Sequence, residues 1–109
     1  MMSIFFYSPL SFANYTCEGK VQGLSIDPRT GALLAEKIGP LNWPKLCSIT
    51  HTSNNISPES CKVIYSSLLA AQMASKEVKF WFNDGRDCSQ KSHTPWQNLT
   101  GWYFGPMIK

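Results

Sequence analysis

The spacing of apolar residues divides the chain into three parts, and the first part has the two-residue period of β-strands. The runs "KVQGLSI" and "ALLAEKI" alternate between apolar and polar residues and are separated by "DPRTG". Pro28 and Gly31 in the separating segment are typical of a tight turn, because proline fixes φ and glycine accepts a positive φ. A β-hairpin is therefore predicted, with Val21, Leu24 and Ile26 as its inward residues.

A third strand and then a helix follow the hairpin. "KLCSITHT" is rich in β-branched residues and comes after the two prolines of "GPLNWP". Next, Ser57 is a helix N-cap candidate, Pro58 fits the first helical position and Glu59 places a negative charge at the positive end of the helix dipole. A helix is predicted from about Pro58 to Ser75. Its mainly apolar face holds Cys61, Ile64, Tyr65, Leu68, Leu69 and Gln72.

Two more strands complete the pattern. "EVKFWFND" alternates again, and "LTGWYFGPMIK" supplies a last, aromatic strand ending near Gly105-Pro106. The first of these strands places Val78, Phe80 and Phe82 on one face and Lys79, Trp81 and Asn83 on the other. The order β-β-β-α-β-β predicts a mainly β fold with one helix (α+β), resembling the five-stranded OB-fold barrel. Other small α+β arrangements share this element count.

The opening thirteen residues, "MMSIFFYSPLSFA", carry no charge. Their apolar run is too short to cross a bilayer, and Ser11-Phe12-Ala13 has the small-x-small pattern of a signal-peptidase site. We therefore expect residues 1–13 to be the remnant of a cleaved signal peptide and residues 14–109 to form a single OB-like domain. The usual basic region is missing, which is consistent with a start inside a longer precursor. The alternative is an apolar N-terminal β-strand.

The four cysteines favour two disulfides, because they contain no C-x-x-C pair and only two histidines accompany them. Such bonds need an oxidising compartment, which predicts a secreted or periplasmic protein. Four cysteines allow three pairings. In an OB-like barrel the first strand lies antiparallel to the fourth, which favours Cys17 with Cys88 and leaves Cys47 with Cys61.

Charge and motifs argue against several functions. The net charge of +3 comes from scattered lysines and arginines with no basic run, so no nucleic-acid partner is expected. No apolar stretch has the length of a transmembrane segment. We expect no enzyme activity, metal or cofactor, since catalytic and phosphate-loop motifs are missing and His51 and His93 lie in polar stretches typical of solvated positions. A small hydrolase using one of these histidines is the remaining catalytic alternative.

Tryptophan is abundant for a chain of this size, and Trp81 lies opposite the predicted core face of its strand. Such a residue can pack in a subunit interface or stack on the apolar face of a sugar, with Lys79 or Asn83 supplying hydrogen bonds. It can also be covered by a loop of its own chain. The other aromatic residues that make this content high are Trp43, Trp96, Trp102 and Tyr103.

Two segments carry a resemblance to a known family. "PESCKVIYSSLLAAQMASKEVKFWFND" and "WYFGPMIK" resemble the second half of small exported bacterial proteins related to the B subunits of AB5 toxins, of the subtilase-cytotoxin and typhoid-toxin type. The resemblance implies an exported OB-fold subunit that assembles as a ring of five and binds glycans on its outer surface. The cysteine positions differ in part, and Tyr15-Thr16 offer only hydroxyls comparable to the family's sugar-contacting serine.

These observations predict a non-catalytic, homo-oligomeric binding module for a glycan or glycoprotein, and the resemblance implies a pentamer. The alternative is a periplasmic protein-protein interaction or inhibitor domain whose aromatic face docks on one partner. The candidate ligand-binding residues are Tyr15, Thr16, Lys79, Trp81 and Asn83.

Overall fold

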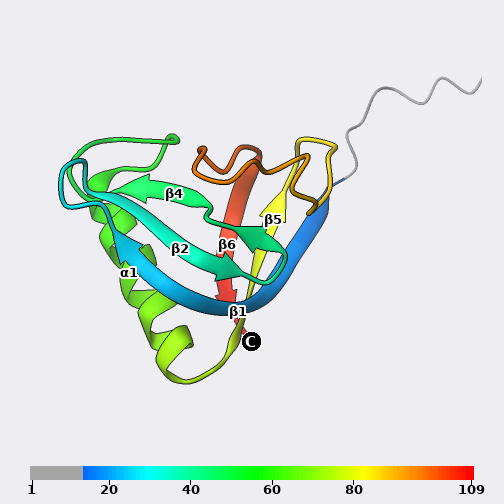
Figure 1. The fold of residues 1–109 in the computed structure, drawn as a ribbon, viewed down its shortest axis with the longest axis horizontal. Helices are drawn as coiled ribbons and strands as arrows, with labels where there is room; N and C mark the ends of the chain where they lie inside the picture. The colour runs from blue at the N-terminus through cyan, green and yellow to red at the C-terminus, as the bar shows by residue number, and fades with distance from the viewer. Residues whose placement is uncertain (1–13) are drawn as a thin grey trace, which may run out of the picture.

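The computed structural model describes residues 14–109, which form one antiparallel sheet of six strands and one helix (Figure 1). The mainly β fold with a single helix agrees with the prediction, and β3 is a two-residue strand that the sequence pattern does not reveal. The predicted signal peptide, residues 1–13, lies outside the described residues. The elements are β1 (Tyr15–Ile26), β2 (Ala32–Ile38), β3 (Leu41–Asn42), β4 (Lys45–Ser48), α1 (Pro58–Met73), β5 (Glu77–Phe82) and β6 (Trp102–Ile108).

Strand β1 joins the two halves of the sheet. Its residues 15–20 pair with β5 and its residues 21–26 pair with β2, and the strand curves strongly between the two partners (Figure 1). Near the change of partner, Gly19 lies against Gly39 of the β2–β3 turn. A Cβ atom on Gly19 would overlap the Gly39 backbone, and one on Gly39 would overlap the Glu18 carbonyl. Both positions therefore require glycine for the turn to pack on the strand.

The remaining strands extend the sheet in both directions. Strands β3 and β4 pair with β2, and β6 pairs with β5. The two ends approach each other where Lys45 and Asn98 form an isolated parallel bridge. The Leu99 N–H donates to the Lys45 carbonyl at 2.9 Å there. One bridge is not a ladder, so the sheet is open, and the OB-fold barrel remains a prediction.

The core lies between the inner face of the sheet and α1. Val78, Phe80 and Phe82 are fully buried, as their alternation predicts. The predicted Ser57 cap is present, and its side chain accepts a hydrogen bond from the Ser60 N–H. The helix presents Cys61, Leu68 and Ala71 to the core and ends two residues before the predicted boundary. The other members of the buried cluster are Cys17, Val21, Leu33, Ala35, Ile38, Leu41, Leu46, Cys47 and Leu99.

The boundaries of β4 and β6 differ from their predicted positions. Strand β4 ends at Ser48, because the hydroxyls of Ser48 and Thr50 turn back to donate to the Thr30 carbonyl. Strand β6 continues through Pro106 to Ile108 instead of ending near the proline. Because β6 is at the edge of the sheet, a missing N–H is tolerated there, and the pairing with β5 shifts register around this point.

Both predicted disulfides are present in the structure. One joins Cys17 to Cys88 and the other joins Cys47 to Cys61, each with a Cα–Cα distance of 5.8 Å. The first fastens the start of β1 to the loop after β5. The second fastens β4 to the first turn of α1. In the described part of the chain, no helix is long and apolar enough to cross a membrane.

The two disulfides should differ in their contribution to stability. They close loops with sequence separations of 71 and 14 residues. In the chain-entropy model, replacing Cys17 and Cys88 by alanine lowers the free energy of unfolding by about 4 kcal/mol, and replacing Cys47 and Cys61 lowers it by about 3 kcal/mol. Urea unfolding of the two double variants measures both losses. The reverse order of stability would contradict the loop-length explanation.

Candidate functional site

Three of the predicted ligand-binding residues share one surface on the outer face of β1 and β5. Thr16 is directly opposite Trp81, and the Lys79 Nζ lies 5.3 Å from the centre of the Trp81 ring. Phe104 of β6 packs edge-on against the same ring at 5.2 Å between centroids. The Lys79 ammonium is also 3.8 Å from the Glu18 carboxylate. Trp81 is therefore partly covered by neighbouring side chains of its own sheet.

The other two predicted residues lie elsewhere. Tyr15 points to the opposite face from Thr16, as strand alternation requires, and its ring stacks on Phe82 with 5.0 Å between centroids. Asn83 lies just beyond the end of β5 and lines a groove next to Trp102. The structure thus distributes the five predicted residues over three places.

The inward Tyr15 side chain forms a partly buried polar cluster with Asp84 and His93. Its hydroxyl donates to Asp84 Oδ1 at 2.7 Å and lies 2.9 Å from His93 Nε2. Because the hydroxyl proton is directed to Asp84, His93 Nε2 carries a proton and donates to the Tyr15 oxygen. Burial and the bond to Asp84 raise the pKa of Tyr15, which keeps the phenol protonated.

The expectation that His93 is solvated is wrong. Only 7% of the residue is exposed, because its ring packs against Phe82 and bonds to Tyr15. Asp84 Oδ2 and His93 Nδ1 are buried without a hydrogen-bond partner among the described residues. Burial lowers the pKa of His93. The Asp87 carboxylate accepts a hydrogen bond from the Ser92 hydroxyl at 3.0 Å.

A different aromatic feature is the stacked pair Trp43 and Trp96. Their ring centroids are 4.3 Å apart and their planes differ by 14°. Trp43 comes from the β3–β4 turn and Trp96 from the loop before β6. The backbone N–H of Trp96 donates to the Trp43 carbonyl at 2.9 Å. Trp96 remains 57% exposed. The pair therefore presents aromatic surface to solvent from a fixed position.

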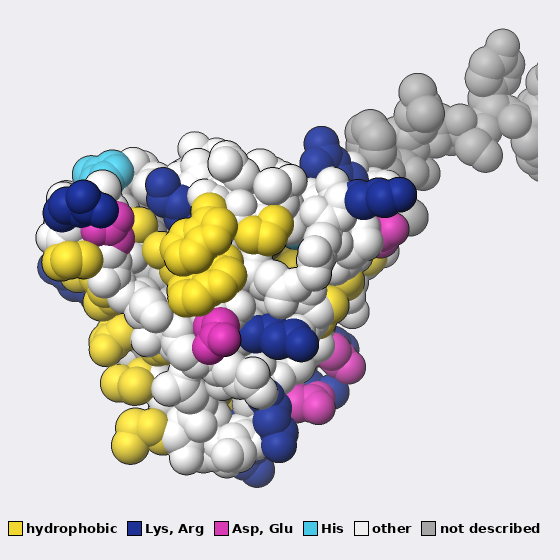
Figure 2. All heavy atoms as spheres, viewed as in Figure 1, with side chains coloured by type: hydrophobic (Ala, Val, Ile, Leu, Met, Phe, Trp, Pro, Cys, Tyr) yellow, Lys and Arg dark blue, Asp and Glu magenta, His cyan; other side chains and the backbone are white. Residues whose placement is uncertain are grey.

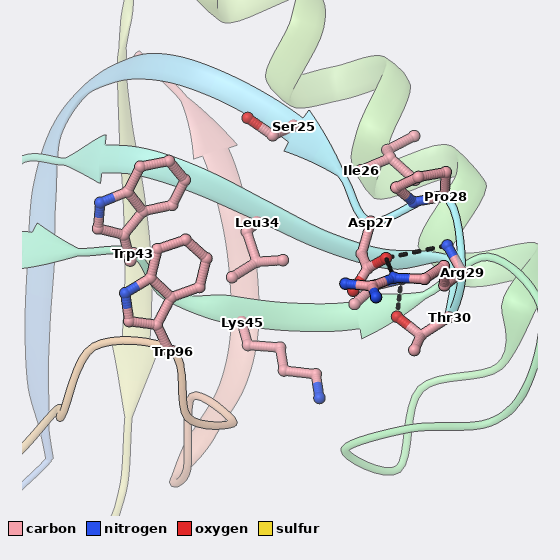
Figure 3. Close-up of a pocket in the computed structure, with 11 residues that line it drawn as sticks. Ser25, Ile26, Asp27, Pro28, Arg29, Thr30, Leu34, Trp43, Lys45 and Trp96 are labelled. Atoms are coloured by element: carbon pink, nitrogen blue, oxygen red, sulfur yellow. Dashed lines mark hydrogen bonds and ion pairs between the residues drawn. The ribbon is translucent and has the colours of Figure 1, made fainter.

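The tryptophan pair forms one wall of a cavity of about 440 Å³, which we call the tryptophan pocket. Figure 3 shows Trp43 and Trp96 side by side on one side and the β1–β2 turn, with Asp27 and Arg29, on the other, with Leu34 between them. Figure 2 shows hydrophobic side chains gathered in the middle of this face, in front of β2 and β4. The remaining lining residues are Ser25, Ile26, Pro28, Thr30, Ala32 and Lys45.

The pocket contains both signs of charge. The Arg29 N–H donates to Asp27 Oδ1 at 2.9 Å, and this bond lowers the pKa of the Asp27 carboxyl. Arg29 Nε lies 3.8 Å from the same oxygen, and Lys45 supplies a second cation. The combination of an aromatic wall, an apolar floor and dispersed polar groups suits a ligand with an apolar face and many hydrogen-bonding groups.

The sequence shows Trp43 and Trp96 as two of several abundant aromatic residues but does not indicate that they meet. Each lies next to a proline, Trp43 before Pro44 and Trp96 after Pro95, which signals a loop with a fixed direction. That signal places each residue outside a strand. It does not say which two loops meet.

Comparisons with protein-family models, with curated proteins and with solved structures find no match for this chain. Among residues 14–109, no group of three or more His, Cys, Asp or Glu side chains is placed to hold a metal ion. The proposed function therefore depends on the geometry of the site and on the sequence resemblance.

The buried His93 predicts a loss of stability in mild acid. Its pKa is lower in the folded protein than the ordinary value of 6.5, so folding favours the neutral ring. The free energy of unfolding is then highest above about pH 6.5 and falls as the pH decreases toward the folded pKa. Asp27 and Asp87, whose pKa values are also lowered, add a further loss only below their usual value of 3.8.

Urea unfolding between pH 7 and pH 5, a range chosen to span the ordinary histidine pKa of about 6.5, measures this effect. His93→Gln keeps a side-chain donor for Tyr15 and removes the titrating ring, so it should flatten the profile. His51→Gln is the matched control, since His51 is exposed, and it should leave the profile unchanged. An unaltered slope in His93→Gln would exclude His93 as the source.

Proposed function

We propose that this protein is an exported, non-catalytic binding module that recognises a glycan in the tryptophan pocket. The observation that carries the proposal is the exposed Trp43–Trp96 stack beside a cavity that combines an apolar floor with charged and hydroxyl groups. A sugar ring has an apolar face of C–H groups and a rim of hydroxyls. Aromatic side chains match the face, and polar side chains match the rim.

The position of the pocket supports an OB-fold interpretation. In OB-folds, the face of strands 2 and 3 and the loops that follow strands 1 and 4 bind oligosaccharides. Here the pocket is lined by β2, β4, the β1–β2 turn and the loop between β5 and β6, which are the corresponding elements when β3 and β4 count as one strand. We further propose that the Lys45–Asn98 bridge marks the line along which such a barrel closes.

Export and assembly extend the same proposal. The two disulfides support a secreted or periplasmic location. The edge strand β6 exposes Phe104 and Ile108, and α1 exposes Val63 and Met73 to solvent. Figure 2 shows hydrophobic side chains along the edge of the molecule formed by α1. We propose that these surfaces join copies of the chain, and the resemblance to AB5 B subunits suggests a ring of five that binds glycoproteins multivalently.

The exposed aromatic surface on β5 and β6 favours a second candidate, a periplasmic protein-protein interaction or inhibitor domain. Trp81 and Phe104 contact each other there, and Phe104 is 61% exposed. Aromatic residues are enriched at the centres of protein interfaces. Two variants distinguish the candidates, because the glycan pocket and this surface use different tryptophans.

Trp96→Ala should weaken glycan binding by about tenfold or more, because it removes the exposed half of the aromatic wall. Trp81→Ala is the matched control and should bind like the unaltered protein. A glycan array identifies the ligand, calorimetry measures both affinities, and thermal unfolding checks that each variant folds. Loss of binding in Trp81→Ala alone would show that the glycan binds at the outer face of β5 instead of in the tryptophan pocket. The lack of any bound glycan, together with capture of a protein by the Trp81 surface, would support the second candidate.

Multi-angle light scattering should give a mass that is a multiple of the monomer. Phe104→Lys, which places a charge on the exposed edge strand, should shift the protein toward the monomer without unfolding it. Lys91→Ala, an exposed polar change in the loop between β5 and β6, is the control and should leave the mass unchanged. A monomer for the unaltered protein at high concentration would contradict the proposed assembly.

A further inference from the structure

A second concave site lies between the segment before α1 and the beginning of β6. It is a groove of about 650 Å³ that shares no lining residue with the tryptophan pocket. We call it the amide groove, because asparagine side chains occur on both of its walls. The lining residues are Asn54, Asn55, Ile56, Ser57, Ser60, Ile64, Asn83, Gly101, Trp102, Tyr103 and Gly105.

One wall of the groove is built on a pair of asparagines with left-handed backbone. Asn54 and Asn55 have φ values of 57° and 60°. The Asn54 side chain hydrogen-bonds to the backbone of two other segments. Its Nδ2 donates to the Leu99 carbonyl at 2.9 Å and to the Leu46 carbonyl at 3.3 Å. Ser53 and Ile56 exchange backbone hydrogen bonds around the pair. These contacts fix the loop and leave the Asn55 carboxamide exposed on the groove wall.

The opposite wall is held by the end of the sheet. The Asn83 N–H donates to the Gly101 carbonyl at 2.9 Å, which sets the position of Asn83 next to the start of β6. The Trp102 Nε1–H donates to the Phe104 carbonyl at 3.1 Å, so the indole ring has a fixed orientation. Asn83 itself is exposed. Within residues 14–109, the Asn55 and Asn83 carboxamides form no hydrogen bond, and both line the groove together with the fixed Trp102 ring.

The composition of the lining defines the ligand class. It contains no Asp, Glu, Lys, Arg or His, in contrast to the tryptophan pocket with Asp27, Arg29 and Lys45. A carboxamide both donates and accepts hydrogen bonds, as does a sugar hydroxyl. An ionic ligand would lose hydration without gaining an opposite charge. The lining therefore suits an uncharged molecule that is rich in hydroxyls and has one apolar face.

We propose that the amide groove is a binding site for a neutral saccharide, held between Asn55 and Asn83 and against Trp102. This site is separate from the tryptophan pocket and does not require the pocket to bind a glycan. It gives the chain two sites of different chemistry, one with charged groups and one without.

The test uses the disulfide-bonded protein labelled with ¹⁵N and titrated with three neutral disaccharides: lactose, maltose and cellobiose. At least one should shift the backbone amide signals of Asn55, Asn83 and Gly101, with saturation below about 50 mM. Asn55→Gly removes one carboxamide while suiting the positive φ, and Asn83→Ala removes the other. Each should weaken binding by about tenfold.

Two controls separate this site from the tryptophan pocket. Asn98→Ala, which removes an exposed carboxamide outside the groove, should not change the affinity. Trp96→Ala should leave the groove signals unchanged, whatever it does to binding at the pocket. Shifts confined to pocket residues and abolished by Trp96→Ala, or the absence of shifts with all three sugars, would overturn the proposal.

Discussion

The double pairing of β1 is the constraint on which the rest of the structure depends. The first half of β1 pairs with β5 and its second half pairs with β2, so one strand aligns both parts of the sheet. The curve that this demands is permitted by the contact between Gly19 and Gly39. The Cys17–Cys88 bond then prevents the first half of β1 from separating from β5. The shared strand and the disulfide therefore stabilise the fold in addition to the burial of its small core.

The functional surfaces follow from the same constraint. Because the sheet bends back on itself, the β1–β2 turn and the loop before β6 line one cavity although they are distant in sequence. The β2 residues Ala32 and Leu34 point outward and would be an exposed apolar strip on a flat sheet. The tryptophan pair partly covers this strip and turns it into the floor of the pocket. The strand alternation that buries Phe80 and Phe82 separates Trp81 from the core in the same way.

The features that depend on local periodicity could be predicted from the sequence. The hairpin, the helix with its Ser57 cap and the buried face of β5 each result from side chains close together in the chain. The candidate site could not be predicted, since Trp43 and Trp96 meet only through the approach of the two sheet ends. His93 shows the same limit. Its polar neighbours indicate a solvated residue, whereas Tyr15, far away in sequence, supplies the partner that keeps it buried.

The contact between the β3–β4 region and the loop before β6 couples ligand binding to the stability of the fold. Three contacts connect these two segments at one junction. They are the Trp43–Trp96 stack, the backbone hydrogen bond between the same residues and the Lys45–Asn98 bridge. A molecule bound in the tryptophan pocket would contact residues on both sides of this junction, so its binding energy would also hold the two sides together. Separation of the two sides and release of such a ligand would therefore be linked equilibria. The pocket exists only while the two segments are in contact, because each segment supplies part of its lining.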